Sequence, residues 1–494
     1  MFVHNFCLFL TLLPVSGVVT GFCFIWRFCG KPCLCLVMIS EFDTIAAIAT
    51  PLSASGIGII RVSGEQSAEL VDKIFSGRKH LYEYAPNTIN YGHIVDASGQ
   101  MVDEVLVSVF KAPHSYTGEN SIEINCHGGI YILRKVLSLV FDIGVRPAEP
   151  GEFSKRAFLN GRMDLSEASS VMDLISSSSE ASYKNSLRQL SGFLSKKVKN
   201  IRAEIIHEAA FVEAALDDPE HYDLDGFDSK LSVLLNKWCS EITELINSYH
   251  EGSLIRDGIN TVISGRPNVG KSSLLNFLSG HDKAIVSDIP GTTRDMIEDR
   301  VVLGNVVLNL VDTAGIRQTS DQVESIGVEK AIKAQSDAEL NLYLVDSSVQ
   351  LTDDDIKYLS EFDESSAIVL LNKSDLDSVT NSDDIHRFFS GHVVEFSTKT
   401  GEGLEKLKAC VSELFFNGGL DRDKFYITSE QNYNDLKEAI RSLNLVQRSI
   451  ADGLSEDFFT GDLYDAYRSL GHIIGEEVEE DLVNKVFSDF CMGK

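Results

Sequence analysis

GRPNVGKSS, residues 265–273, decides the fold of the middle of this 494-residue chain. It fits G-x-x-x-x-G-K-[ST], and it lies between a strand-like run, NTVISG, and a helical run, SSLLNFL. In this context backbone N–H groups surround phosphates, a lysine reaches the outer phosphates and a serine hydroxyl binds Mg²⁺. The loop residues expected at a nucleotide are Asn268, Val269, Gly270, Lys271, Ser272 and Ser273.

Four further motifs follow in the order of a GTP-binding domain. GTTRD offers hydroxyls to the Mg²⁺ and γ-phosphate region, and with the residues before it we assign Ser287, Asp288, Ile289, Pro290, Gly291, Thr292 and Thr293 to the site. DTAG follows the strand VVLNLV and adds Asp312, Thr313, Ala314 and Gly315. NKSD and the later STK loop add Asn372, Lys373, Asp375, Ser397, Thr398 and Lys399. The Asp375 carboxylate can accept two hydrogen bonds from guanine, whereas adenine offers no such pair of donors. The nucleotide is therefore predicted to be GTP.

The residues that activate water are less evident. Many GTPases place a glutamine after the DTAG-like segment, but Ile316 stands there in this chain. On the following segment, Asp321 and Glu324 are the acidic candidates for activating water. The alternative is that their charged side chains are only solvated. Asn268 has two interpretations as well. Its amide oxygen could bind a monovalent cation that neutralises phosphate charge, or it could simply stabilise the turn.

The pattern of strands and helices predicts a multidomain protein. Residues 257–416 alternate strands with helices, as in an α/β P-loop GTPase (Ras-like) domain. The flanking residues, 154–256 and 417–494, read as helical, so we expect one discontinuous all-α domain into which the α/β domain is inserted. Residues 38–153 mix β-rich runs with a helix and predict an α+β domain with an antiparallel sheet.

Residues 1–37 differ from the rest. They lack Lys, Arg, Asp and Glu before Arg27, and they hold five of the nine cysteines: Cys7, Cys23, Cys29, Cys33 and Cys35. We interpret them as an upstream extension of the reading frame, with the protein starting at Met38, or as a poorly ordered tail. A membrane anchor or targeting segment is the alternative. The sparse cysteines elsewhere suit a reducing cytosol, so a cytoplasmic protein without stable membrane association is expected.

The net charge of −29 argues against a protein that coats nucleic acid. Any contact with RNA must come from a local basic patch. Candidates are Lys196, Lys197, Lys199 and Arg202, although a solvated helix face explains that run better.

Four stretches outside the nucleotide motifs carry a resemblance to a known family. They are DTIAAIATP…GIGIIRVSG (43–64), SYTGENSIEINCHGG (115–129), RPAEPGEFSKRAFLNGRMDLSEA (146–168) and FCMGK (490–494). Together with the nucleotide motifs, they resemble the tRNA modification GTPases of the MnmE (TrmE) family from Met38 to Lys494. The extension 1–37 has no counterpart there, Met492 departs from the usual aliphatic residue, and ITSEQNYNDL (427–436) is poorer in Arg and His than the family pattern.

The resemblance implies a fold and an activity. The N-terminal domain would dimerise and bind a tetrahydrofolate derivative, 5-formyl- or 5,10-methylene-tetrahydrofolate. A K⁺-activated GTPase would work with the FAD-dependent flavoprotein MnmG (GidA) in a heterotetramer. Together they would add an aminomethyl or carboxymethylaminomethyl group at C5 of the wobble uridine (position 34) of certain tRNAs.

The resemblance also assigns roles to residues. Asn268, Ser287, Ile289 and Thr292 would hold K⁺, Ser272 and Thr293 would bind Mg²⁺, and Glu324 rather than Asp321 would position water. Folate would meet Arg61, Glu123, Arg162 and Lys494, because its glutamate carboxylates pair with cations. Cys491 would act as a catalytic thiol, or else pack and anchor Lys494.

Two other classes of protein fit parts of the sequence. A ribosome-assembly or RNA-binding regulatory GTPase shares the nucleotide motifs, but it would be expected to carry a basic appendage. A membrane-anchored switch rests on residues 1–37 alone.

Overall fold

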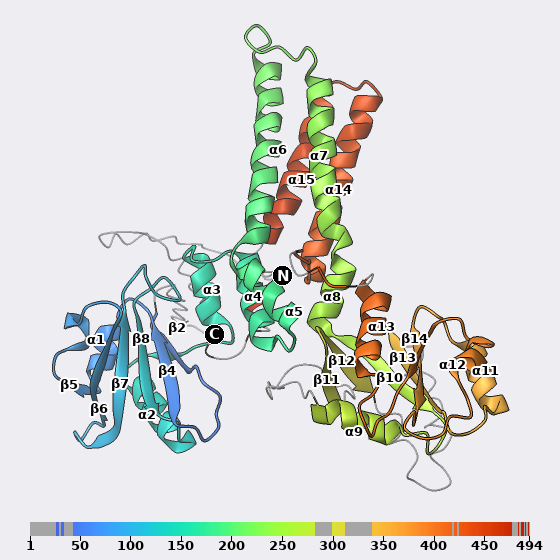
Figure 1. Cartoon of the computed structure of the whole chain (residues 1–494). Helices are drawn as coiled ribbons and strands as arrows, with labels where there is room; N and C mark the ends of the chain where they lie inside the picture. The colour runs from blue at the N-terminus through green and yellow to red at the C-terminus, as the bar shows by residue number, and fades with distance from the viewer. Residues whose placement is uncertain are drawn as a thin grey trace, which may run out of the picture. The chain divides into compact units, whose positions relative to one another are not determined.

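The structure is a computed structural model of the chain. It describes residues 26–28, 31–33, 43–281, 299–311, 338–416, 419–421, 424–476, 483, 486–488, 490 and 493. They form two compact units (Figure 1). The first contains the described residues up to Ser115, Glu119–Ala148 and Gly493, and the second contains Tyr116–Gly118 and the other described residues. None of the described helices has the length and apolar character needed to cross a membrane.

The first unit is built on a seven-stranded sheet with the order β5-β6-β7-β8-β4-β3-β9. Its strands are β3 (Ile45–Ile48), β4 (Ile57–Ser63), β5 (Phe75–Gly77), β6 (Thr88–Val95), β7 (Met101–Phe110), β8 (Ser121–His127) and β9 (Arg146–Pro147). All its pairs are antiparallel except β3 with β9. Two helices, α1 (Ser67–Asp72) and α2 (Ile130–Asp142), complete an α+β unit of the predicted kind. Near the N-terminus, β1 (Trp26–Phe28) pairs with β2 (Lys31–Cys33).

One face of this sheet forms the core, and the other stays open. Along β7, Val105 and Val107 are buried, whereas Leu106 between them is 48% exposed. The buried valines share a core cluster with Val71 of α1 and Val136 of α2, so both helices pack on the same face. Because side chains alternate between the faces of a strand, the opposite face is available for binding.

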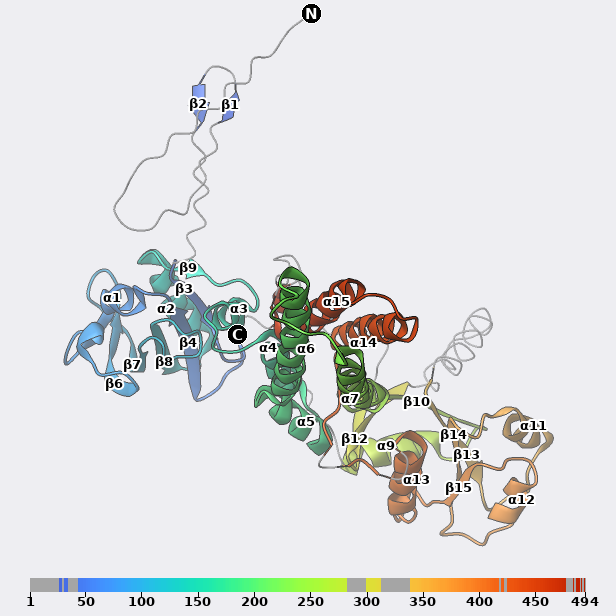
Figure 2. The same ribbon diagram turned by 90° about the horizontal axis from the view of Figure 1, so that it is seen from above.

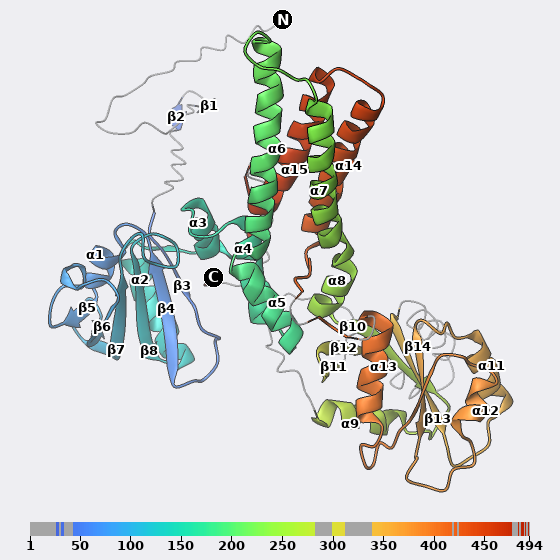
Figure 3. The ribbon, with the colours of Figure 1, turned by 45° about the horizontal axis from the view of Figure 1, so that its top comes forward.

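The second unit contains a bundle of four long helices, which lie side by side in Figures 2 and 3. These are α6 (Phe193–Asp217), α7 (Phe227–Asn247), α14 (Glu430–Ala451) and α15 (Asp457–Ile474), preceded by α3 (Glu152–Leu159), α4 (Leu165–Ser176) and α5 (Glu180–Leu190). Fully buried Trp238, Leu443 and Leu470 belong to one core. Helices from before and after the α/β domain therefore pack together, as predicted. A capping box starts α4, with the Asp164 side chain accepting the N–H of Glu167 at 3.0 Å.

Arg202 on α6 cannot contact RNA, so its place among the basic candidates was wrong. Its side chain is 4% exposed, and its guanidinium is bonded to Glu476 and lies over the ring of Tyr467 at 3.9 Å. In the same run, half-buried Lys197 and exposed Lys199 lie 3.6 and 3.5 Å from carboxylates. These contacts fit the solvated helix face.

The α/β part of the second unit has a six-stranded sheet with the order β11-β12-β10-β13-β14-β15. The strands are β10 (Ile259–Gly265), β11 (Asp299–Leu303), β12 (Val306–Val311), β13 (Leu340–Asp346), β14 (Ala367–Asn372) and β15 (His392–Glu395). Only β11 pairs antiparallel with its neighbour among these described strands. The helices are α9 (Lys271–His281), α11 (Asp353–Glu361), α12 (Ser382–His386) and α13 (Leu404–Phe416). In such a sheet the ligand-binding edge is at the carboxyl ends of the strands.

A packed joint connects the α/β part to the bundle. Phe425 and Ile427 belong to the bundle core, whereas Tyr426 between them belongs to the core of the α/β part. The Asn185 side chain on α5 donates from Nδ2 to the Tyr426 carbonyl at 3.0 Å and accepts the Tyr426 N–H at 2.9 Å. The entering helix is α8 (Tyr249–Asp257), whose Ile255 is also buried in the α/β core. Both chain crossings are therefore fixed by packing.

A carboxylate between two bundle helices makes stability depend on pH. Burial raises the pKa of Asp435 on α14 to about 6, although His472 of α15, 3.6 Å away, opposes the shift. The folded state then holds the proton more tightly than the unfolded state, so stability falls as pH rises from about 4 to about 6. We expect Asp435→Asn to raise the free energy of unfolding at pH 7 by about 1–2 kcal/mol, after allowance for solvent screening.

Urea titrations at several pH values test this expectation. The gain should shrink below pH 6 and vanish below about pH 3, because Asp435 is then protonated in both the folded and the unfolded state. Exposed Asp452, at the end of α14, provides the control substitution Asp452→Asn, which should change stability by no more than about 0.5 kcal/mol. A gain that is the same at pH 4 and pH 7 would contradict the assignment.

Candidate functional site

The phosphate loop follows β10 and leads into α9, as predicted. Asn268 has φ +68°, a left-handed conformation that asparagine tolerates better than most residues. Gly270 has φ +107°, and a Cβ placed there would lie 2.2 Å from Nδ2 of Asn372. The loop is thus pressed against the carboxyl end of β14, and only glycine fits at that point.

The polar side chains predicted to bind phosphate and metal lie at the start of α9. Lys271 donates from Nζ to the carbonyls of Gly265 and Arg266, 2.7 Å each. Ser272 and Ser273 are exposed in the first turn of the helix. A helix N-terminus with free N–H groups attracts anions, so this end of α9 can receive phosphate.

The residues predicted to read the base lie at the neighbouring strand ends. Asn372 is buried and joins the two halves of the site: Nδ2 donates to the Val269 carbonyl at 2.8 Å, and Oδ1 accepts the Thr398 N–H at 3.2 Å. Asp375 accepts from the Ser397 hydroxyl at 2.8 Å, which orients its carboxylate.

Two lysines near the base loop are held by carboxylates. Lys399 lies 3.7 Å from Asp375, and Lys373 lies 2.5 Å from Asp346. Burial alone would raise the pKa of Asp346, but hydrogen bonds from Lys373 and Ser348 outweigh it and lower the pKa. Asp346 therefore stays ionised and can hold the lysine stem in place. No motif pointed to Asp346, although it ends the apolar run LNLYLVD that forms β13.

Several predicted site residues fall outside the residues that the structure describes. They are Ser287, Asp288, Ile289, Pro290, Gly291, Thr292, Thr293, Asp312, Thr313, Ala314, Gly315, Asp321, Glu324, Cys491 and Lys494. The described residues bring together the phosphate loop, NKSD and the STK loop.

A second group of predicted residues lies on the open face of the N-terminal sheet. Arg61 of β4 and Glu123 of β8 stand opposite each other in register, and the Arg61 Nε lies 2.9 Å from the Glu123 carboxylate. The Arg61 NH1 also donates to the carbonyl of Gly493 at 3.2 Å, which brings the C-terminal tail to this pair. Both side chains keep partial exposure, 16% and 22%. Arg162 follows α3 in the second unit.

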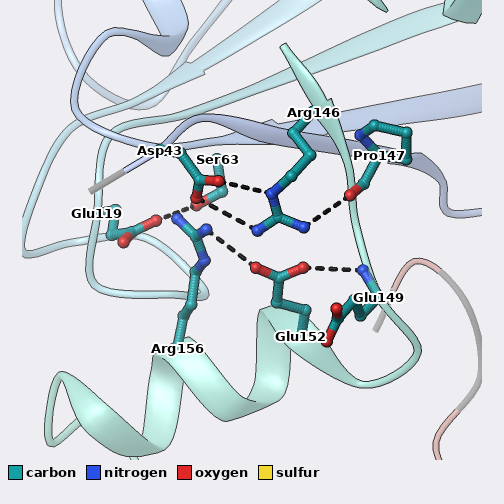
Figure 4. Close-up of polar contacts among 8 residues, drawn as sticks. All are labelled: Asp43, Ser63, Glu119, Arg146, Pro147, Glu149, Glu152 and Arg156. Atoms are coloured by element: carbon teal, nitrogen blue, oxygen red, sulfur yellow. Dashed lines mark hydrogen bonds and ion pairs between the residues drawn. The ribbon is translucent and has the colours of Figure 1, made fainter. Parts of the chain in front are cut away.

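Another arginine fixes the edge of the same sheet (Figure 4). Arg146 of β9 makes a two-point contact with the Asp43 carboxylate, with distances of 2.5 and 3.2 Å, and it donates to the Pro147 carbonyl at 2.9 Å. Ser63 at the end of β4 donates to Glu119 at 2.8 Å. These contacts hold the ends of β3, β4 and β9.

In the second unit, a carboxylate organises the start of α3. Glu152 accepts the backbone N–H of Glu149 at 2.8 Å and lies 3.0 Å from the buried Arg156 one turn later (Figure 4). A carboxylate in the first turn of a helix is favourable, so α3 starts at a defined residue. Arg146 and Arg156 lie in the stretch RPAEPGEFSKRAFLNGR, in which the family resemblance implied a role only for Arg162.

Two family models match this chain, one over its N-terminal domain and one over the rest of the chain. The model described as "GTP-binding protein TrmE N-terminus" matches residues 44–162. The model described as "MnmE helical domain" matches residues 165–491, a range that includes the inserted α/β part.

Similar proteins span the chain. A tRNA modification GTPase MnmE from Lachnoclostridium phytofermentans is 50% identical over 456 residues, which cover 92% of this chain and 99% of the relative. Proteins of the same name from Lactobacillus delbrueckii subsp. bulgaricus and Acetivibrio thermocellus are 43% and 42% identical, with the same shares covered. Among solved structures, the G domain of the T. maritima FeoB iron transporter is similar over 32% of this chain and 98% of its own, with 28% identity and a TM-score of 0.24. The chain therefore belongs to the MnmE (TrmE) family and is a GTPase of the tRNA modification class.

Proposed function

We propose that this GTPase is activated by K⁺ and acts with an MnmG (GidA) flavoprotein to modify C5 of the wobble uridine in certain tRNAs. The one-carbon unit comes from 5-formyl- or 5,10-methylene-tetrahydrofolate bound by the N-terminal domain. The observation that supports this most is that one chain holds both the phosphate loop and, on a separate sheet, the partly exposed Arg61–Glu123 pair. A simple nucleotide switch needs only the loop.

Nucleoside analysis of tRNA tests the proposal directly. Cells that lack this protein are expected to lose the modified nucleoside at position 34 and to regain it when the gene is restored. If the wobble nucleosides are unchanged in the deletion strain, the proposed reaction is wrong, whereas GTP hydrolysis by the purified protein would stand unaffected.

In the nucleotide site, each proposed role follows from chemistry. Lys271 offers a positive charge to the outer phosphates, and Ser272 with Thr293 offers hydroxyl oxygens to Mg²⁺. Asp375 accepts hydrogen bonds from guanine. Glu324 is proposed to position the attacking water. K⁺ bound by Asn268, Ser287, Ile289 and Thr292 would neutralise charge that develops on the phosphates.

The potassium assignment leads to a prediction for Asn268. We expect GTP turnover by the unchanged protein to be on the order of 100-fold faster in K⁺ than in Na⁺, and Asn268→Gly to remove the difference. Glycine adopts φ +68° without strain, so this variant keeps the turn and loses the side-chain amide with its oxygen.

Turnover at equal ionic strength in KCl and NaCl measures the effect, and GDP affinity serves as the control for loop integrity. Because glycine preserves the turn, an Asn268→Gly protein that still responds to K⁺ would show that the asparagine only shapes the loop. Indifference of the unchanged protein to the cation would reject the potassium site itself.

The folate assignment rests on charge and exposure. The Arg61 guanidinium can pair with a carboxylate of folate, and Glu123 can accept hydrogen bonds from the amino edge of the pterin. Arg162 and Lys494 are proposed to add positive charge. Cys491 is proposed to act as a thiol during modification, with packing of the tail as the alternative.

We expect Arg61→Ala to weaken the binding of 5-formyl-tetrahydrofolate by about 10- to 100-fold, the size expected for the loss of a charged hydrogen bond. Equilibrium dialysis of the full chain measures this affinity without GTP. Arg78→Ala, which removes an exposed arginine in the same unit, should bind folate normally. Equal loss in both variants would indicate a general charge effect, and no loss in either would exclude the site.

The open face of the N-terminal sheet also supports a homodimer. Ile89 and Tyr91 of β6 and Leu106 of β7 are 69%, 56% and 48% exposed, and Tyr91 stands opposite Leu106. Exposed apolar patches mark sites of association. We propose a homodimer that joins MnmG in a heterotetramer in the cytoplasm, and sedimentation of the full chain tests the first step.

A further inference from the structure

We propose that Arg266 is a positioning residue for nucleotide binding, because its side chain anchors the start of the phosphate loop to the N-terminus of α11. The inference rests on the proposed assignment of this loop to GTP. Arg266 occupies the first variable position of the G-x-x-x-x-G-K-[ST] pattern, which places no demand on its side chain. Its contacts give that side chain a defined role.

The guanidinium reaches across to α11, which begins almost 90 residues later in the sequence. NH1 of Arg266 donates to Oγ1 of Thr352 and to Oδ2 of Asp355, 3.0 Å each. Thr352 is the N-cap of α11, and Asp355 completes a capping box with it. The arginine therefore binds a point that the helix cap has already made rigid.

The Asp355 carboxylate is a buried and fully used acceptor. Its residue is 3% exposed. Oδ2 also accepts the N–H and the hydroxyl of Thr352 at 3.0 and 2.7 Å, and Oδ1 accepts the Tyr343 hydroxyl at 3.0 Å. Burial alone would raise the pKa of Asp355, but the hydrogen bonds from Thr352, Arg266 and Tyr343 outweigh it and lower the pKa. The anchor is thus charged at neutral pH, and removing its arginine leaves a buried charge with fewer donors.

The same network reaches the strand beside the loop. Tyr343 lies on β13 directly opposite Ser264 of β10, the residue that precedes the loop's first glycine. The start of the loop is therefore held from two sides, by the neighbouring strand and by the cap of α11.

On the side of the phosphate loop, Arg266 also contacts Lys271, the lysine predicted to reach the outer phosphates. The backbone carbonyl of Arg266 accepts Nζ of Lys271 at 2.7 Å, beside the carbonyl of Gly265. Two residues further along, Asn268 adopts φ +68°. Without the anchor, the loop start can move, and the fraction of molecules with a binding-competent loop falls. Apparent affinity falls by that same fraction, for GDP and GTP alike.

A second ion pair in the α/β part provides a matched control. Arg387, the residue that follows α12, lies 3.4 Å from Asp384, and its side chain is 71% exposed. Exposed pairs of this kind contribute little. Arg387→Ala removes an arginine from an Asp–Arg pair in the same domain without touching the loop.

Titration of the full chain with GDP and with a non-hydrolysable GTP analogue, in Mg²⁺, tests the proposal. Arg266→Ala is expected to weaken both nucleotides about tenfold and to leave kcat at saturating GTP within about twofold. Asp355→Asn should also weaken both nucleotides, and the loss in the double variant should be smaller than the two single losses combined, because both variants break the Arg266–Asp355 contact. Arg387→Ala should bind as the unchanged protein does.

Three results would overturn the inference. The first is unchanged nucleotide affinity in Arg266→Ala. Even if the melting temperature of this variant were lowered, unchanged affinity would mean that the arginine is only structural. Additive losses in the double variant would show that Arg266 does not act through Asp355. An equal loss in Arg387→Ala would indicate a general charge effect. If the unchanged protein binds neither nucleotide, the assignment of the loop itself fails, which is a separate outcome.

Discussion

We expect Asp375→Asn to convert the protein from a GTP-binding to an XTP-binding enzyme. The Asp375 carboxylate offers two acceptors, which match the N1–H and the amino group of guanine. Asparagine replaces one acceptor by a donor. Xanthine has a carbonyl where guanine has the amino group, so the asparagine amide matches xanthine and leaves guanine facing a donor. We expect affinity for GTP to fall by a factor on the order of 10⁴ and XTP to become the better substrate.

Competition between GTP and XTP for the Asp375→Asn protein, followed by turnover of each, measures the exchange. The Ser397 hydroxyl that orients Asp375 can bind the asparagine oxygen in the same way, so the loop should keep its shape. Asp377→Asn, an exposed neighbour on the same loop, is the matched control and should retain full preference for GTP. If Asp375→Asn still prefers GTP, this carboxylate does not read the base.

The segments that form the nucleotide site could be predicted from the sequence, because each motif depends on a few adjacent residues. The strand that ends in Asn372 and the loop that starts at Gly265 both follow from local apolar runs and glycine placement. The pairing of Asn372 with the Val269 carbonyl joins residues 103 positions apart, and nothing local in the sequence specifies it. The motif order predicted which segments meet, but it could not predict the bonds between them.

The positions and partners of buried polar residues were the hardest to predict from the sequence. Arg202 stands in a run of lysines, a pattern that makes it a candidate surface cation, but its guanidinium on α6 lies over the ring of Tyr467. Arg266 and Asn185 likewise gain their partners only when distant elements meet. Hydrophobic spacing indicates which helix face is buried, but it carries no information about which buried positions hold an arginine or an asparagine.

Gly252→Ala is expected to destabilise the joint between the bundle and the α/β part by about 3 kcal/mol. A Cβ added to Gly252 on α8 would lie 2.0 Å from the carbonyl oxygen of Ile427, far inside van der Waals contact. That carbonyl has little freedom to retreat. The Ile427 N–H is bound by Ser248 Oγ at 3.0 Å, and the Asn185 side chain holds both backbone groups of Tyr426. The clash must therefore push apart two elements that share buried cores.

Urea unfolding followed by the fluorescence of Trp238, which is fully buried in the bundle, measures this loss. For a loss of this size the urea midpoint should fall by about 1–2 M.

Gly461→Ala on α15 is the matched control, because that glycine is exposed and an added Cβ meets no atom within 4 Å. Alanine there should raise stability by about 0.5–1 kcal/mol through its helix propensity. Opposite shifts in the two variants would distinguish the clash from any general effect of replacing a helical glycine. If instead Gly252→Ala is as well tolerated as Gly461→Ala, the chain crosses between the two parts through a loose linker, and the contacts of Asn185 and Ser248 do not fix it.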